Sequence, residues 1–90
     1  MASIKYKDPD SVLDWQINWA NKLETGESIS ASTWTVPAGI TKDSDSFTGT
    51  ATTIWLSGGT LGDGYTVVNH ITTNLGRERD KTIIFIIRED

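Results

Sequence analysis

The stretch GYTVVNHITT, residues 64–73, is the longest alternating segment of the sequence and decides the expected fold class. In an extended chain, every second residue from Tyr65 to Ile71 falls on one side, whereas Val68 and His70 fall on the other. Threonine and valine are β-branched and fit well on the surface of a sheet. This pattern predicts a long β-strand that packs against a core through the side that carries Tyr65.

Other segments alternate in a similar way and are separated by turn sequences rich in glycine, aspartate and proline. One short helical turn is expected near residues 19–25, where Trp19 and Leu23 are four residues apart. Strands at such short intervals predict an all-β fold, an antiparallel β-sandwich of six or seven strands that residues 1–90 form as a single domain. The further strand candidates are residues 11–19, 28–36, 51–57 and 81–88, with a short one near Ile4 and Tyr6.

The start of the long strand narrows the fold class. Tyr65 follows a tight Asp63-Gly64 turn, which is the position of the tyrosine corner in immunoglobulin-like sandwiches, where the phenol bonds to the backbone of the preceding turn. Val67 then takes the place of a cysteine in antibody domains, and Trp34 is the candidate for the central core tryptophan. An ordinary half-buried tyrosine is the alternative, but an immunoglobulin-like sandwich is the expected fold.

Four tryptophans supply much of the buriable area of this small chain. We expect Trp15, Trp34 and Trp55 to have structural roles, together with Tyr65. An alternative interpretation, a carbohydrate-binding module, would instead place Trp19 or Trp55 on the surface as a platform for a sugar. Because the core is small and needs large side chains, burial of the tryptophans is the expected outcome.

The bulk composition excludes several classes of protein and site. The formal net charge of −4 argues against nucleic-acid binding, which requires a surplus of lysine and arginine on one face. The absence of cysteine excludes disulfides and cysteine-based metal sites. The first ten residues lack the apolar stretch of a signal peptide, and the longest apolar run, five residues, is far shorter than the ~20 that a membrane-spanning helix needs.

The sequence contains no motif that demands an enzyme or a cofactor, because nucleophile elbows, Walker loops and dinucleotide fingerprints are all missing. His70, the only histidine, lies in the middle of a predicted strand and is expected to be structural or half exposed rather than catalytic. Asp8, Asp10, Asp43 and Asp45 are turn-forming residues whose oxygens also suit calcium, so an ion site at these predicted loops stays an alternative.

The stretch IIFII, residues 83–87, is apolar on both sides of an extended strand. A two-sheet sandwich of this size has one inner layer, so we expect the odd-numbered residues in the core and Ile84 and Ile86 on the outer face. A second cover over the strand, made by the N-terminal segment or by residues 19–27, would explain this surplus, and an interface with another chain would explain it equally. The candidate interface residues are Ile84, Ile86, Val68 and His70.

Several motifs are similar to those of a family of small phage proteins. The segments KDPDSVLDWQINWANKL, ISASTWTVPAGIT and TTIWLSGGTLGDGYTVVNHITTNLGRERDKTIIFII resemble, in the same order and spacing, the patterns KDPxxxLDY, STWTVPxGI, WLSGGTxGxxYTVxNxITT and GRxxDRSI. The resemblance spans residues 7 to 88. The sequence departs from the pattern at Trp15, His70 and Lys81, where Tyr, Arg and Arg are favoured, and the change at His70 removes a fixed positive charge from a position where a partner could be contacted.

The members of this family are described as phage structural or fiber–tail adaptor proteins with an immunoglobulin-like fold and without a catalytic motif. The resemblance therefore implies a non-enzymatic virion protein, an assembly module at the neck or tail. Its implied partners are other virion proteins and copies of itself, with no nucleic acid and no membrane. A capsid decoration protein is the main alternative, because small β-domains of this kind also bind to capsomers.

Overall fold

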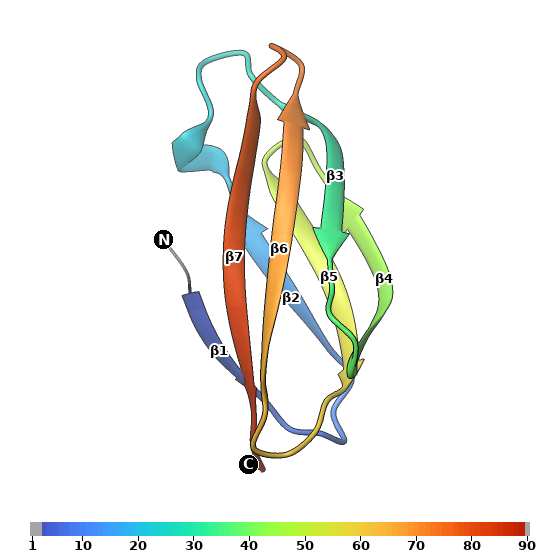
Figure 1. Cartoon of the computed structure of the whole chain (residues 1–90). Coiled ribbons are helices and arrows are strands. Elements are labelled where there is room, and N and C mark those ends of the chain that lie inside the picture. The colour runs from blue at the N-terminus through green and yellow to red at the C-terminus, as the bar shows by residue number, and fades with distance from the viewer. Residues whose placement is uncertain (1–2, 90) are drawn as a thin grey trace.

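Residues 3–89, the part of the chain that the computed structural model describes, form seven strands and one 3-10 turn (Figure 1). The predicted all-β sandwich is confirmed, and the helical turn falls within the expected stretch. The elements are β1 (Ser3–Lys7), β2 (Leu13–Asn18), η1 (Ala20–Lys22), β3 (Ile29–Thr35), β4 (Ile40–Phe47), β5 (Ala51–Gly58), β6 (Gly64–Thr73) and β7 (Glu78–Ile87).

The strands form two sheets, which we call sheet A, with the order β1-β7-β6-β3, and sheet B, with the order β2-β5-β4. The orders β7-β6-β3 and β2-β5-β4 correspond to the GFC and BED strands of an immunoglobulin-like sandwich. Strand β1 lies parallel to β7, whereas the other strand pairs are antiparallel, so sheet A is mixed. Figure 1 shows β1 and η1 on one side of the molecule and β3 and β4 on the other.

One strand was not predicted, and one boundary differs from the prediction by more than two residues. Strand β4 covers ITKDSDSF, which had been expected to form a loop, and β7 begins at Glu78 rather than at Lys81. Strand β4 is an edge strand, and all of its residues after Ile40 are exposed. An exposed edge strand needs no apolar alternation, and charged side chains there protect it from pairing with other chains. The polar sequence therefore did not identify it as a strand.

The core lies between the inner faces of the two sheets. Every second residue is buried along β6 and in β7 from Ile83 onward, as the alternation predicted, and Ile83, Phe85 and Ile87 point inward. Ile54 and Leu56 of β5 face them from sheet B. The buried apolar side chains are Ile17, Trp19, Ile29, Trp34, Ile40, Ile54, Leu56, Tyr65, Val67, Ile71, Ile83, Phe85 and Ile87.

Three of the four tryptophans contribute to this core. Trp19 and Trp34 are buried, and the half-buried Trp15 packs edge-on against Phe85 with 5.1 Å between ring centroids. The expected burial is wrong for Trp55, which is 41% exposed, because it lies between the inward-facing Ile54 and Leu56 and so points to the outer face of sheet B. Burial of Trp19 also excludes it as a sugar platform.

The tyrosine corner is present at the start of β6. The hydroxyl oxygen of Tyr65 accepts a hydrogen bond from the backbone N–H of Thr60 at 3.0 Å, which fixes the turn between β5 and β6. Gly39 lies against the same ring with a φ of +103°, and a Cβ added there would come within 2.8 Å of Tyr65 Cε1. The Tyr65 ring can pack here only because residue 39 is a glycine, which adopts a positive φ without strain and has no side chain.

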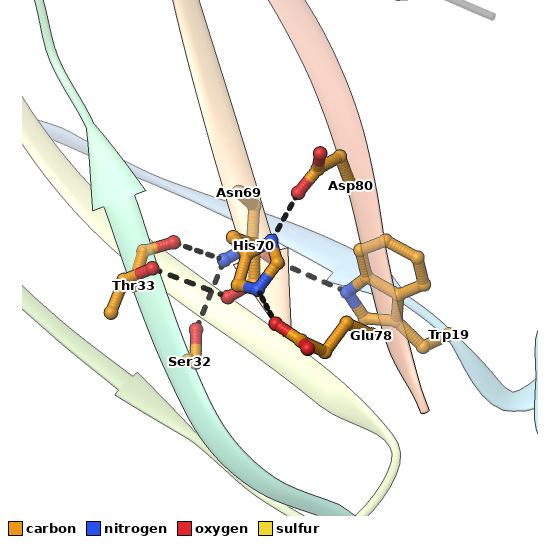
Figure 2. Close-up of polar contacts among 7 residues, drawn as sticks. All are labelled: Trp19, Ser32, Thr33, Asn69, His70, Glu78 and Asp80. Carbon is orange, nitrogen blue, oxygen red and sulfur yellow. Dashed lines mark hydrogen bonds and ion pairs between the residues drawn. The ribbon is translucent and has the colours of Figure 1, made fainter. Parts of the chain in front are cut away.

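A buried polar network joins the two sheets at the centre of β6 (Figure 2). The side-chain oxygen of Asn69 accepts hydrogen bonds from Thr52 Oγ1 at 2.7 Å and from Trp19 Nε1 at 3.2 Å. Its amide nitrogen donates to Ser32 Oγ at 3.0 Å and to the backbone oxygen of Thr33 at 2.9 Å. Asn69 thus holds β3, β5 and the end of β2 in one register.

Candidate interface on the outer face of sheet A

The four predicted interface residues all lie on the outer face of sheet A, beside two residues of β1. Ile4 pairs with Ile84 and Tyr6 pairs with Ile86, so these four side chains lie side by side. Val68 of β6 points to the same face and is half-buried, as are Ile84 and Ile86. We call Ile4, Tyr6, Ile84, Ile86 and Val68 the apolar strip.

The apolar strip is open to solvent. Ile4 is 58% exposed and Tyr6 is 49% exposed. Strand β1 extends sheet A beside β7 instead of folding over its back, and the segment around η1 lies at the edge of the sandwich (Figure 1). The alternative in which the N-terminal segment or residues 19–27 form a second cover over β7 is therefore wrong for the described residues, and Ile84 and Ile86 are half-buried.

At the end of the apolar strip where Tyr6 pairs with Ile86, the side chain of Arg88 lies over the Tyr6 ring. The guanidinium carbon of Arg88 lies 3.9 Å from the centroid of the Tyr6 ring, which is close enough for a cation–π interaction. Arginine and tyrosine are residue types that contribute strongly to protein interfaces. This end of the strip therefore places a charged side chain beside the apolar surface.

His70 lies on the same face but belongs to a charged cluster with two carboxylates of β7 (Figure 2). Its Nδ1 contacts Asp80, and its Nε2 lies 2.8 Å from an oxygen of Glu78. Hydrogen bonds to Asp80 and then to Glu78 raise the pKa of His70 above its ordinary value, against a smaller opposing effect of desolvation. The outer face of sheet A thus has an apolar part and a separate charged part.

The acidic residues considered for an ion site make hydrogen bonds and ion pairs with other residues of the chain. Asp43 and Asp45 lie on β4, where Asp43 accepts a hydrogen bond from Ser57 and Asp45 pairs with Lys42 at 3.3 Å. The side chain of Asp8 accepts the backbone N–H of Asp10 at 2.8 Å, as in a turn. Among residues 3–89, no group of three or more His, Asp or Glu residues could hold a metal ion.

Lys7 is a buried residue whose position the sequence did not reveal. Its side chain points inward from β1, is 1% exposed, and donates hydrogen bonds to the backbone oxygens of Asp8 at 2.9 Å and Gly58 at 2.8 Å. Burial lowers the pKa of Lys7, while the charges of Asp8, Asp10 and Asp43 oppose that change. Asp8, Asp10 and Asp43, three of the four carboxylates considered as ion ligands, therefore favour the charged form of the Lys7 ammonium group.

A small immunoglobulin-like sandwich with an open apolar strip is typical of a protein that binds other proteins. Residues 7–86 match the family described as "Podophage GP4 fiber-tail adaptor protein gp77". The chain belongs to this family. A comparison with curated proteins gives no match. The matched residues run from the end of β1 nearly to the end of β7 and include Val68, His70, Ile84 and Ile86.

Membership of the fiber–tail adaptor family confirms the main interpretation of the sequence. The protein is a structural component of the phage tail, located in the virion, and it is not an enzyme. Its role as an adaptor implies contacts with tail and fiber proteins. The description supports the tail adaptor and not the capsid decoration protein that was the alternative. No helix within the described residues is long and apolar enough to cross a membrane.

Proposed function

We propose that this adaptor works as a passive connector whose outer face of sheet A binds another virion protein. The observation that carries the proposal is the apolar strip, where Ile4 and Tyr6 extend the apolar surface of Ile84 and Ile86 into solvent. Contiguous exposed apolar residues on a small domain mark an interaction surface. Burying them against a partner removes apolar area from water, which is the main source of binding free energy.

The position of the charged residues also fits an interface. Arg88 and Tyr6 lie at one end of the strip, and the cluster of His70, Glu78 and Asp80 lies toward the opposite end of β7. An apolar centre with a polar margin is the usual anatomy of a protein interface. The strip supplies the buried centre, and the charged cluster restricts which partners can approach, since a like-charged surface would be repelled.

We further propose that copies of the chain associate with one another in the virion. Phage tails are symmetric assemblies, and in a symmetric ring the same surface patch recurs on every copy. A small domain without disulfides also gains stability from association, because binding favours the folded state. The apolar strip supports this proposal as well, since the structure offers each copy an identical apolar surface.

The test is the double substitution Ile84→Lys with Ile86→Lys, which places two charges on the strip and leaves the core unchanged. Thr53→Lys is a matched control, because Thr53 is half-buried on the outer face of the central strand of sheet B. Circular dichroism would check folding, analytical ultracentrifugation would measure self-association, and virions produced with each variant would be assayed for incorporated chain.

We expect the double variant to stay folded, to lose self-association and to be missing from purified virions, while the control is incorporated normally. Normal incorporation of a folded double variant would exclude the strip as the contact surface. If incorporation is lost while self-association persists, the strip binds a different virion protein and copies of the chain associate elsewhere. An unfolded double variant would be replaced by Ile4→Lys, whose side chain is more exposed.

A further inference from the structure

A groove runs along the edge of the sandwich where β1 and β7 of sheet A face β2 of sheet B. It consists of two hollows of about 240 and 140 Å³. Both are lined by Ile17, Asn18 and Lys81, so they adjoin. The side of the molecule that carries β1 and η1 in Figure 1 contains this groove, which is distinct from the outer face of sheet A.

Four cations from three elements of the chain, β1, η1 and β7, converge on this groove. Arg79 and Lys81 alternate with the outward-facing Glu78 and Asp80 and so point to the inner side of β7. Lys5 points inward from β1, because it pairs with the core residue Phe85. Lys22 comes from the last turn of η1. Half of the eight lysines and arginines of a chain with net charge −4 therefore line one groove.

These cations form no ion pair within the part of the chain that the structure describes, although the charge of Arg79 contributes to lowering the pKa of Glu27. The ion pairs between residues 3 and 89 involve Lys42, His70 and Arg77, and none involves Lys5, Lys22, Arg79 or Lys81. Asp80 also lines the groove, but its carboxylate contacts His70 on the outer face. The groove thus carries an excess of positive charge on an acidic protein, which would attract a negatively charged ligand.

The groove also has a free strand edge along one wall. The backbone N–H of Trp19 donates a hydrogen bond to the backbone oxygen of Thr50 at 2.7 Å. The register of β2 with β5 continues from this pair through Asn18 with Ala51 and Gln16 with Thr53. In an antiparallel ladder the backbone groups of alternate residues turn away from the paired strand. The backbone N–H and C=O groups of Gln16 and Asn18 therefore point away from β5, along the free edge of β2 that lines the groove.

The two sheets differ in width on this side. Sheet A has four strands and ends with β1, whereas sheet B has three and ends with β2. The position in sheet B that would lie opposite β1 is therefore not filled by any strand of residues 3–89. In many immunoglobulin-like sandwiches a strand occupies this place beside the second strand.

We propose that the groove receives an extended acidic segment of a partner virion protein, which adds to β2 as a fourth strand of sheet B. The backbone of the segment would pair with the free edge at Gln16 and Asn18, as in strand addition. Its carboxylates would lie against Lys5, Lys22, Arg79 and Lys81. The free edge of β2 favours a peptide over a nucleic acid, because it offers strand hydrogen bonds that a nucleic acid does not use.

This inference does not depend on the apolar strip. An adaptor must hold two proteins at once, so it needs two separate contact surfaces. The strip and the groove are different in chemistry, since one is apolar and the other is cationic with a strand edge. Each can be removed by substitutions that leave the other in place.

The test measures binding of labelled probes to the full chain by fluorescence polarisation. The main probe is a heptapeptide of alternating Glu and Val, compared with a Gln–Val peptide and with a Glu–Val peptide whose backbone nitrogens are methylated at alternate residues. A single-stranded oligonucleotide tests the alternative of nucleic acid. The protein variants are Lys22→Glu, Lys22→Glu with Arg79→Glu, and the control Lys42→Glu, since all three positions are exposed.

We expect the Glu–Val peptide to bind in a salt-dependent way and to lose roughly tenfold in affinity in the double groove variant. Lys42→Glu should weaken binding much less than Lys22→Glu, because Lys42 lies on β4 at the opposite edge of sheet B. The Gln–Val and methylated peptides should bind weakly, and the variant Ile84→Lys with Ile86→Lys should bind the Glu–Val peptide normally.

Four results would overturn the proposal. Equal binding of the methylated peptide would show attraction by charge without strand addition. Tighter binding of the oligonucleotide would identify a different class of ligand. Unchanged binding to the folded groove variants would place the peptide elsewhere. Self-association that the groove variants abolish would also overturn the proposal, because the occupant would then be a second copy of the chain.

Discussion

Asn69 and His70 are neighbours on β6 and face opposite sides of sheet A, and both make several polar contacts (Figure 2). Asn69 points into the core, is fully buried, and contacts Trp19, Ser32, Thr33 and Thr52 from three other parts of the chain. His70 points outward, and its two partners both belong to β7. Both clusters are polar, but they differ in the number of contacts, in burial and in the elements that they connect.

This difference decides what each cluster contributes. If the hydrogen bond of Asn69 with Trp19 or Thr52 is broken, the polar group of that partner remains buried. No water molecule replaces the lost bond, so the cost of removing the group from water is not compensated. If a contact of His70 is broken, water replaces it, because Asp80 and Glu78 are exposed. The inner network therefore specifies how the sheets pack, whereas the outer cluster affects charge on the surface.

The largest effect is expected for Asn69→Ala. It removes four hydrogen bonds at once, and it leaves the buried polar groups of Trp19 and Thr52 and the partly buried bonds to Ser32 and Thr33 with fewer partners. We expect the free energy of unfolding to fall by about 2–4 kcal/mol, measured by urea denaturation with circular dichroism. His70→Ala on the adjacent residue is the matched control and should leave the midpoint nearly unchanged. Equal losses for both variants would contradict the distinction between the two clusters.

A smaller loss is expected for Trp19→Phe, which removes only the indole N–H from the network. The oxygen of Asn69 keeps its bond from Thr52, so the expected loss is about 1–2 kcal/mol in the same measurement. Trp34→Phe is the control, because Trp34 is also buried in the core but its Nε1 has no hydrogen-bond partner within residues 3–89.

Both substitutions shrink a buried ring, so their difference isolates the hydrogen bonds of Trp19. A loss for Trp34→Phe as large as that for Trp19→Phe would show that ring volume, and not the network, determines the effect.

The inner cluster was partly visible in the sequence, and alternation also placed Val68, His70, Ile84 and Ile86 on the outer face of sheet A, whereas the cationic groove was not predicted. Alternation along residues 64–73 placed Asn69 on the core side, because a strand with one buried face repeats every two residues. Its partners could not be identified, since Thr52 and Ser32 come from other strands whose register depends on the whole sandwich.

Pairing between distant segments explains the remaining errors as well. Alternation correctly separated Trp55 from Ile54 and Leu56, but it could not show that nothing covers the outer face of sheet B. The parallel position of β1 leaves no local signal, although it creates both the apolar strip and one wall of the cationic groove. Lys5, Lys22, Arg79 and Lys81 are scattered in the sequence and meet only through topology, so composition alone did not indicate a cationic surface.

The smallest effect is expected for the pH dependence of the outer cluster. Because Asp80 and Glu78 raise the pKa of His70 in the folded protein, its protonated form is favoured by folding. This contribution is fully present below the unfolded pKa of about 6.5 and is lost as the pH rises through the higher folded value. We therefore expect the urea midpoint of the wild type to fall slightly between pH 6 and pH 8, relative to His70→Arg, whose charge does not titrate. His70→Gln should lie below the wild type at pH 6 and converge with it at pH 8. A constant difference between wild type and His70→Gln across this range would show that the contacts of His70 stabilise the fold without depending on its charge.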